Sequence, residues 1–293
     1  MAAIPSLPDA QISALTGAYD RAVAQRRRST LVGLIVLAAC IALAGWIGEV
    51  RPGVLFANID KFTSYFVRIA HLDSGQVVLA DVGEWFWGLR KWLRLMGETL
   101  LIAYLGTVLG ALGAFLVCFD ASRNMARAGW GRLLARRFLE FCRTVPELVF
   151  ALIFVVAWGL GPLPGILALA IHTMGALGKL FSEVVENIDM KPVEGAIASG
   201  GNWVQGVRFA VLPQVLSNFA SYGLLRFEIN VRGAAVMGFV GAGGIGQDLI
   251  EAIRKFYYSD VSAILLLIIV TVALIDLGTE RIRHALIGME ERR

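Results

Sequence analysis

Runs of about 20 predominantly apolar residues recur along this sequence, and each is long enough to cross the hydrocarbon core of a bilayer as one helix. The chain has 293 residues, of which 57% are hydrophobic and only 17% are charged. Soluble domains carry about 25% charged residues, and one core of this length could not remove so much apolar surface from water. The sequence therefore predicts an all-α membrane protein with about six transmembrane helices. The predicted spans are 30–48, 95–119, 138–160, 163–181, 213–240 and 261–277.

Arginines cluster beside three of these spans, and their positions predict the orientation of the chain. Lys and Arg accumulate in the short loops on the cytoplasmic side of a membrane. Six spans place both termini on one side together with all three clusters, so both termini are predicted to be cytoplasmic. The formal charge of +4 is interpreted as a signal of topology rather than of nucleic-acid binding. The clusters are Arg21 with Arg26–Arg28; Arg123, Arg127, Arg132, Arg136 and Arg137; and Arg281, Arg283, Arg292 and Arg293.

The spans divide the chain into predicted parts. These are a cytoplasmic N-terminal segment (1–28), the first transmembrane helix with an external interfacial segment (29–93), a membrane core (94–285) containing a cytoplasmic loop (187–213), and a cytoplasmic tail (286–293). Aromatic residues in the interfacial segment predict a surface-lying helix and an aromatic belt. They are Phe62, Tyr65, Phe66, Trp85, Phe86, Trp87 and Trp92. The run Leu37–Cys40 resembles a lipoprotein cleavage box, but the long segment before the first apolar run favours an uncleaved anchor.

Nothing in the sequence predicts catalysis, a metal site or a cofactor held by this chain. The phosphate-binding loop Gly-x-x-x-x-Gly-Lys-Ser/Thr is absent, and the three histidines and three cysteines have no metal-ligand spacing. A glycine-rich run resembles a dinucleotide-binding loop but follows a predicted membrane helix instead of a strand. Its glycines are predicted to form a sharp external turn or gate, followed by a short amphipathic helix over 247–258. They are Gly241, Gly243, Gly244 and Gly246.

The most specific motif lies between the fourth and fifth spans. It reads Glu-Gly-Ala-x3-Gly-x9-Ala-Val-Leu-Pro and resembles the cytoplasmic loop signature of ABC importer permeases, Glu-Ala-Ala-x3-Gly-x9-Ile-x-Leu-Pro. A helix over 192–199 is predicted to end at Gly200 and to be followed by a second helical stretch that reaches Pro213. Gly195 and Ala210 depart from the signature, both toward smaller residues. The predicted ATPase-coupling residues are Glu194, Gly195, Ala196, Gly200, Leu212 and Pro213.

Further stretches narrow the resemblance to phosphonate-type permeases, over roughly residues 95–285. They are Arg143–Leu148, Gly159–Pro162, His172–Leu180, Arg226–Arg232 and Gly238–Gly246. The resemblance implies a type I ABC importer permease in the bacterial inner membrane, for phosphonate or a related oxyanion such as phosphite or phosphate. It also implies a second copy of the chain, two ATP-binding subunits at the cytoplasmic face, and an external, periplasmic substrate-binding protein. ATP and Mg would be bound by the partner subunit.

Charged residues within the predicted fifth span require a partner or a water-lined cavity, because ionisable groups are costly in a bilayer. Glu228 and Arg232 are spaced to pair on one helical face, whereas Arg226 is not. Arginine suits phosphate-like oxygens, so one interpretation places Arg226, Asn230 and Arg232 along an anion path. The other is that these charges join helices to each other or to the second copy. The residues proposed for this path are Arg226, Glu228, Asn230 and Arg232.

Two other functions stay open at the level of sequence. An ion-coupled secondary carrier would relay protons through His172, Glu98 or Glu228, although no internal repeat of the kind common in such carriers is evident. A membrane scaffold or assembly protein without transport activity would show no substrate-dependent ATP hydrolysis in any complex that contains this chain. Arg143 and Glu147 are spaced to pair, four residues apart, although Pro146 between them is expected to disturb the helix or to start it anew. Glu98 is predicted to be a lone charge near a membrane end, and His172 a packed polar residue.

Overall fold

The structure, a computed structural model, describes residues 9–72 and 74–290. Within this part of the chain the regular elements are helical, and His71 and Val77 form an isolated antiparallel bridge. The fold class is therefore all-α, as the apolar runs predict. The chain divides into two compact units, Met1–Tyr65 and Phe66–Arg293, which are described separately. This boundary falls inside the predicted segment 29–93.

The first unit is dominated by one long helix, α1 (Asp9–Ile47), followed by α2 (Pro52–Ala57) and the beginning of α3 (Ile59–Ile69). The part of α1 that is apolar enough to cross a membrane runs over Gly17–Ile47. The helix starts well before the predicted span 30–48 because arginine is a good helix former, so the Arg26–Arg28 run does not interrupt it. Residues 1–8 of the predicted N-terminal segment lie outside the described residues.

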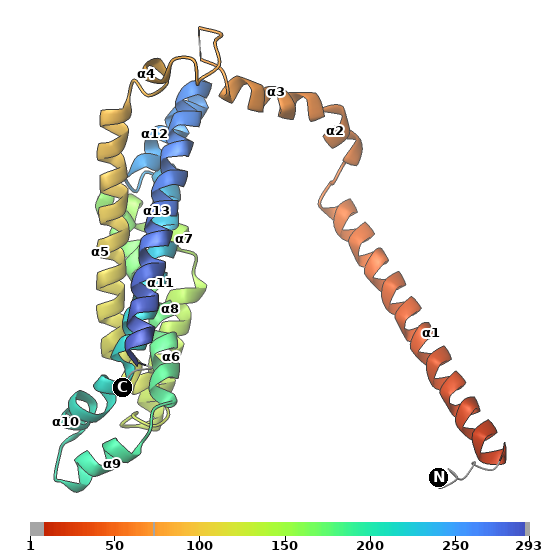
Figure 1. The fold of residues 1–293 in the computed structure, drawn as a ribbon, viewed down its shortest axis with the longest axis vertical. Helices are drawn as coiled ribbons and strands as arrows, with labels where there is room; N and C mark the ends of the chain where they lie inside the picture. Colours follow the sequence, from red (N-terminus) through yellow and green to blue (C-terminus); the bar gives the residue numbers. More distant parts are fainter. Residues whose placement is uncertain (1–8, 73, 291–293) are drawn as a thin grey trace, which may run out of the picture. The chain divides into compact units, whose positions relative to one another are not determined.

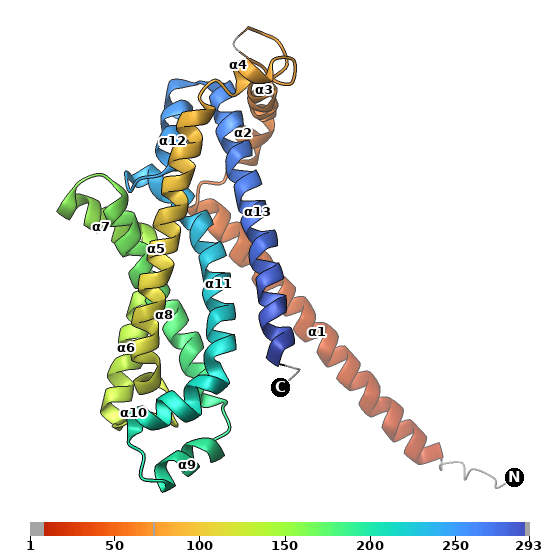
Figure 2. The same ribbon diagram turned by 60° about the vertical axis from the view of Figure 1, so that its left-hand side comes forward.

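The second unit is a bundle in which α5, α8, α11 and α13 run side by side (Figures 1 and 2). Helices α9 and α10 lie at the end where α13 finishes, here called the α9 end, and α4 and α12 lie at the opposite α12 end. The helices are α4 (Val82–Trp85), α5 (Leu89–Ala121), α6 (Gly129–Thr144), α7 (Glu147–Trp158), α8 (Pro162–Glu186), α9 (Lys191–Ala198), α10 (Trp203–Gly206), the π-helix η1 (Val207–Val211), α11 (Leu212–Met237), the 3-10 turn η2 (Gly238–Val240), α12 (Ile245–Lys255) and α13 (Tyr258–Glu290).

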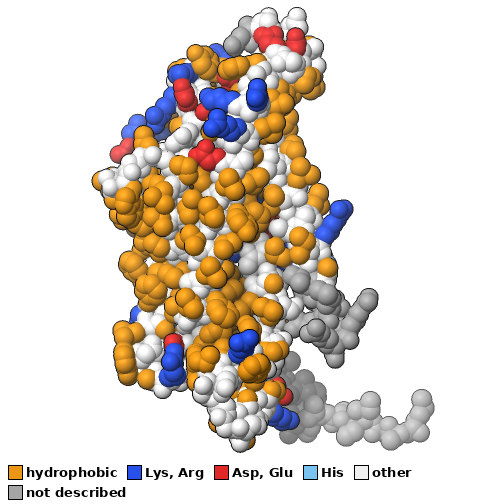
Figure 3. All heavy atoms as spheres, turned by 90° about the vertical axis from the view of Figure 1, so that its left-hand side faces the viewer, with side chains coloured by type: hydrophobic (Ala, Val, Ile, Leu, Met, Phe, Trp, Pro, Cys, Tyr) orange, Lys and Arg blue, Asp and Glu red, His pale blue; other side chains and the backbone are white. Residues whose placement is uncertain are grey.

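Among the described residues four helices are individually long and apolar enough to cross a membrane. They are Gly17–Ile47, Leu89–Ala121, Pro162–Glu186 and Tyr258–Ala285. Two bent pairs, α6 with α7 and Trp203–Val240 with α12, also meet the length and composition criteria as pairs, which brings the number to six. The face of the molecule drawn in Figure 3 is largely hydrophobic along its middle, and most of its charged side chains lie toward the two ends.

The predicted third span, 138–160, is not one straight helix. Helix α6 ends at Thr144, α7 starts at Glu147, and the two axes differ by 84°. Proline disfavours helical conformation in the residue before it and lacks the amide hydrogen that a helix interior needs, so Pro146 ends α6 and begins α7. The expected disturbance at Pro146 is confirmed. The bend separates Arg143 from Glu147, so the pair that their spacing suggested is not formed.

Glycines set the close packing of α5, α6 and α8. A Cβ built on Gly106 of α5 would lie 2.6 Å from Leu169 Cβ of α8, and one built on Gly110 would lie 2.6 Å from Thr173 Cβ. On the other side of α8, a Cβ on Gly175 would meet the Leu139 carbonyl oxygen of α6 at 2.7 Å. Small residues at membrane helix interfaces let backbones approach closely, and this packing positions the polar side chains described below.

Two tryptophans of the predicted aromatic belt are buried within the protein. Trp85 of α4 donates from Nε1 to the Ser262 hydroxyl of α13 at 2.9 Å, and Trp92 of α5 is only 2% exposed. Both belong to an apolar cluster at the α12 end that also contains Ile245 and Ile264. They therefore attach α4 and α5 to α12 and α13, and the predicted belt is wrong for these two residues.

Candidate functional site

The segment 187–213 has the local structure that its glycine and proline spacing predicts. Helix α9 covers Lys191–Ala198, and Gly200 follows with φ +85°, a left-handed conformation that an L side chain adopts only with strain. The Gly200 amide donates to the Ile197 carbonyl and the Gly201 amide donates to the Ala196 carbonyl. These bonds close the last turn of α9, and the left-handed conformation of Gly200 turns the chain away from the helix axis.

Apolar contacts anchor α9 to the bundle. Val193 is 2% exposed and belongs to a cluster with Phe181 and Val185 of α8 and Val215 of α11. Gln214 of α11 reinforces this contact: its Oε1 accepts from the Asp189 amide at 3.0 Å. Through this cluster and the Gln214–Asp189 bond, α9 is attached to the end of the bundle formed by α8 and α11.

The stretch after Gly200 is held equally firmly. Asn202 and Gln205 form a capping box at the start of α10, and Trp203 Nε1 donates to the Met125 carbonyl at 2.9 Å. The Arg127 guanidinium lies over the Trp203 ring, 4.3 Å from its centroid. The loop between α5 and α6 thus braces the second half of the 187–213 segment.

Pro213 does not break the helix that it enters. The residues before it form the π-helix η1, and the chain continues through Leu212 into α11. A proline clashes with the carbonyl four residues earlier, here that of Phe209, and a π-turn widens the backbone at that point. The predicted second helical stretch is thus continuous with the fifth span.

The outer surface of α9 is exposed. Glu194 and Gly195 face outward, as does Ile197, which is 58% exposed, whereas Ala196 is half-buried. Val193 is the residue through which α9 is buried, so the opposite face of the helix is free to meet another protein. That face presents one apolar side chain beside a carboxylate and a glycine, a combination suited to a protein contact.

The charged and polar residues of α11 divide between two faces. Asn230 is 1% exposed, and its Nδ2 lies 2.8 Å from the Thr107 hydroxyl of α5 and 2.8 Å from the Thr173 hydroxyl of α8. Arg226, one turn earlier, is half-buried and points toward the same threonine, with Nε 3.5 Å from Thr173 Oγ1. Arg226 and Asn230 therefore face α8, where α5, α8 and α11 meet.

Glu228 and Arg232 face α13 instead. The two side chains form an ion pair along α11, as their spacing predicts, and Glu228 interacts with Asp276 and Arg283 of α13. Glu228 is buried, whereas the Arg232 side chain is about half exposed at 52%. The four residues proposed for one path thus belong to two separate groups.

A carboxylate and an imidazole complete the group that faces α8. Glu147, at the start of α7, places Oε2 2.8 Å from His172 Nδ1 of α8, and the carboxylate also interacts electrostatically with Arg226. Together, these residues form a polar cluster within the helices. Its members are Thr107, Glu147, His172, Thr173, Arg226 and Asn230.

The glycine loop folds tightly at the α12 end. Gly241, Gly243 and Gly244 all have positive φ, between +79° and +85°, and the Gly244 amide donates to Glu98 Oε1 of α5 at 3.3 Å. Gly246 is packed against the Ala235 carbonyl of α11. The prediction of a sharp turn followed by a short amphipathic helix is confirmed by α12. Glu98 is not a lone charge, because it caps the amide end of this helix.

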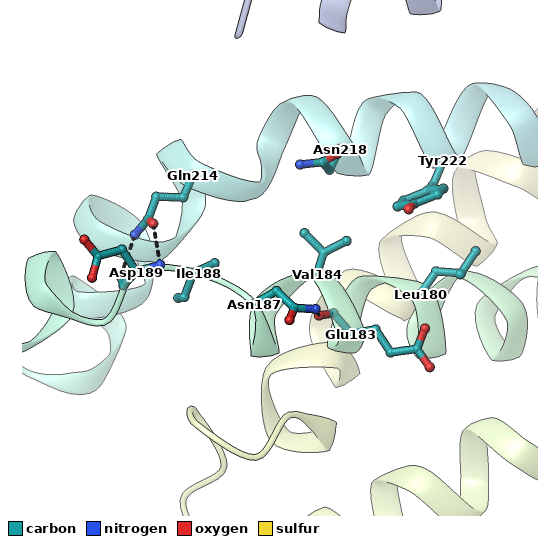
Figure 4. Close-up of a pocket in the computed structure, with 9 residues that line it drawn as sticks. All are labelled: Leu180, Glu183, Val184, Asn187, Ile188, Asp189, Gln214, Asn218 and Tyr222. Atoms are coloured by element: carbon teal, nitrogen blue, oxygen red, sulfur yellow. Dashed lines mark hydrogen bonds between the residues drawn. The ribbon is translucent and has the colours of Figure 1, made fainter. Parts of the chain in front are cut away.

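A pocket of about 410 Å³ lies between α8 and α11 near the α9 end (Figure 4). Asn218 and Tyr222 of α11 face Val184 of α8 and Asn187, the residue after α8, across it, and Gln214 bonds to Asp189 at one side. Arg226 follows Tyr222 by one helical turn. The pocket therefore lies one helical turn of α11 away from the polar cluster.

Reasoning from sequence missed three members of the polar cluster: Glu147, Thr107 and Thr173. Glu147 was assigned to Arg143 by spacing alone, and the two threonines gave no signal because threonine is common in membrane helices. His172 was interpreted as a packed polar residue or, in the secondary-carrier alternative, as a proton relay. The missing information was tertiary, since the cluster draws on four helices that are separated in sequence.

Known proteins resemble this chain in sequence and fold. A protein family described as "Binding-protein-dependent transport system inner membrane component" matches residues 106–287. The phosphite transport system permease protein PtxC of Stutzerimonas stutzeri is 44% identical over 191 residues, which cover 65% of this chain and 70% of that relative. The phosphate-import permease protein PhnE of Mycolicibacterium smegmatis is 40% identical over 190 residues, covering 65% of this chain but 36% of that relative. A solved structure of a bacterial ABC transporter involved in the import of alginate has a TM-score of 0.59 at 12% identity, covering 82% of this chain and 96% of the matched chain.

Proposed function

The chain belongs to the family of binding-protein-dependent transport system inner membrane components, and from this premise we propose that it forms the membrane path of an ATP-driven importer of phosphorus oxyanions. Its fold is that of a type I ABC importer permease. The relatives named for phosphite and phosphate transport support the substrate class. Phosphonate, phosphite and phosphate are all tetrahedral anions, and arginine and amide donors bind such oxygens well.

The observation that carries the proposal is the construction of α9. Its outer face exposes Glu194 and Ile197, while Val193 on its inner face is buried among residues of α8 and α11. A separate ATP-binding subunit docks on this outer face and moves α9, and the buried contacts pass the motion to the helices that carry the polar cluster. ATP and Mg are bound by that subunit, and the α9 end faces the cytoplasm.

The complete transporter in this proposal is an assembly in the bacterial inner membrane. Two copies of this chain enclose one path, two ATP-binding subunits drive it, and an external binding protein delivers the substrate. Within each copy Arg226 and Asn230 border the path, whereas Glu228 and Arg232 brace α13 against α11. The turn at Gly241, Gly243, Gly244 and Gly246 closes the external side. Both termini lie in the cytoplasm.

The proposal is tested by uptake in cells that express the chain with its neighbouring subunits. Labelled phosphite, phosphate and methylphosphonate are supplied separately, with and without ATP depletion and with and without an uncoupler. We expect uptake of at least one of them to stop on ATP depletion and to persist when only the proton gradient is removed. Uptake that survives ATP depletion and stops with the uncoupler would instead support the secondary-carrier alternative, in which His172, Glu98 or Glu228 relays a proton.

A further inference from the structure

We propose that Arg143, His172 and Lys179 form a second oxyanion-binding site, which the substrate occupies after it passes Arg226 and before it leaves at the α9 end. This site rests on the proposed function. It extends the proposed path beyond α11, because Arg143 lies on α6 and both His172 and Lys179 lie on α8. The three residues surround one pocket, here called the basic pocket.

The basic pocket has a volume of about 320 Å³. One water molecule occupies about 30 Å³ in the liquid, so the pocket has roughly ten times that volume. A hydrated tetrahedral anion therefore fits. On α8, the positions 172, 176, 179 and 183 follow one helical face and form one wall. Arg143, in the last turn of α6, places a positive charge on the opposite wall of the pocket. The lining residues are Arg143, His172, Ala176, Lys179, Leu180 and Glu183.

The charge of the pocket favours an anion. Arg143 forms no ion pair within residues 9–72 and 74–290, so its guanidinium is available to a ligand. Lys179 lies 3.5 Å from Glu183, but both side chains are about half exposed, which leaves the ammonium hydrated and able to exchange partners. Formal counting of Arg143, Lys179 and Glu183 gives one net positive charge.

The position of the pocket makes it a continuation of the polar cluster. His172 belongs to both, since its Nδ1 lies 2.8 Å from Glu147 of the cluster. On the other side, Lys179 and Glu183 also line a neighbouring pocket of about 260 Å³, which contains Arg123 and Arg136. This neighbouring pocket also holds Glu140 and Glu186, and Arg136 pairs with Glu186, so its basic and acidic residues are equal in number. The net positive charge is therefore confined to the basic pocket, and the neighbouring pocket is a weaker site on the way to the α9 end. Several weak sites in succession let an ion enter and still leave, whereas one tight site would retain it.

The convergence of sequence stretches supports the same conclusion. Three of the stretches that carry the resemblance to phosphonate-type permeases, 143–148, 172–180 and 226–232, lie far apart along the chain. In the structure each contributes a charged or ionisable side chain to this region: Arg143, His172 and Arg226. The basic pocket and the polar cluster are thus built from the same parts of the sequence.

The test measures oxyanion uptake and ATP hydrolysis together, in proteoliposomes that contain the whole transporter. Arg143→Gln and Lys179→Gln are compared with wild type, using whichever of phosphite, phosphate and methylphosphonate the wild type carries fastest. We expect each variant to lower the uptake rate about tenfold, the loss typical of one charged hydrogen bond, while stimulation of ATP hydrolysis by the loaded binding protein is retained. Arg143→Lys should recover part of the rate. Arg132→Gln, on the same helix but outside the pocket, should match wild type.

A second readout reports occupancy directly and does not depend on turnover. Ala176, which lines the pocket, is replaced by cysteine, and the exposed Cys40 is replaced by serine, while Cys118 and Cys142 are buried. The transported oxyanion should slow modification of A176C by a negatively charged thiol reagent, and adding Lys179→Gln should abolish this protection.

The site is overturned if Arg143→Gln and Lys179→Gln carry the oxyanion at the wild-type rate. It is equally overturned if A176C is modified at the same rate with and without oxyanion, and this readout decides the matter should Arg143→Gln fail to assemble. If the wild-type transporter carries none of the three oxyanions, the proposed function itself is refuted. That outcome is distinguishable from failure of the second site alone, in which the wild type still transports.

Discussion

The 187–213 segment and the polar cluster are built in opposite ways. The segment is continuous in sequence, exposes one face of α9, and is attached through apolar contacts of Val193. The cluster is assembled from α5, α7, α8 and α11, and its members bond to one another within the bundle. One region is suited to meet a partner and to move, whereas the other needs exact helix packing. Substitutions that change packing should therefore damage the cluster far more than the segment.

The largest expected loss of stability and uptake comes from replacing Gly110 of α5, which packs against Thr173 of the polar cluster. Gly110→Val places a Cβ 2.6 Å from Thr173 Cβ and 2.7 Å from the Ala170 carbonyl oxygen, which is backbone and cannot give way cheaply. We expect a loss of about 3 kcal/mol in the free energy of unfolding, at the upper end for overpacking, and loss of uptake. Denaturation in detergent and transport in proteoliposomes measure both. A stable Gly110→Val protein would mean that α5 and α8 are less closely packed than described.

Removing the central amide of the cluster should have the next largest effect. Asn230→Leu leaves the hydroxyls of Thr107 and Thr173 without their donor, and we expect a cost of about 1–3 kcal/mol in the free energy of unfolding. Combining it with Thr173→Val should cost less than the sum of the two single changes, because they remove the same bond. Strict additivity in this double-mutant cycle would contradict the described network.

A smaller effect is expected where the 187–213 segment turns. Gly200→Val forces a branched side chain into φ +85°, at a cost of about 1–2 kcal/mol that falls on α9 rather than on the bundle. Binding of the ATP-binding subunit, measured by co-purification, should weaken. Gly206→Ala is the matched control, since Gly206 has φ −57° and open space around its Cβ position. Equal behaviour of the two variants would mean that the Gly200 turn has no part in docking.

The smallest expected change is a gain. Gly195 lies in α9 with nothing within 4 Å of a built Cβ, so Gly195→Ala should stabilise α9 by about 0.5–1 kcal/mol. This is the substitution toward alanine that the loop signature carries at this position. Thermal unfolding and co-purification of the ATP-binding subunit should both be unchanged or improved. A clear loss of binding would show that the partner requires the glycine backbone to approach closely at this point.

The two regions also differ in how far the sequence predicts them. The motif from Glu194 to Pro213 specifies a helix, a left-handed glycine and an uninterrupted entry to α11, because each of these depends on neighbouring residues. The pairing of Glu228 with Arg232 is local in the same sense and was predicted correctly. Glu147 shows the limit: its spacing suggested Arg143, but Pro146 turns the chain by 84° and directs the carboxylate to His172. Burial of Trp85 and Trp92 was missed for the same reason, since their partners lie on α12 and α13.

The central claim is that this chain forms a phosphorus-oxyanion path and takes its energy from a separate ATPase through α9. The most direct measurement is the number of oxyanions accumulated per ATP hydrolysed, in proteoliposomes containing the purified transporter and its external binding protein. We predict accumulation only when ATP is present on the side that bears α9, and a fixed ratio that falls when Gly200 is replaced by valine. Accumulation without ATP, or a ratio that does not change in the Gly200→Val variant, would contradict the account.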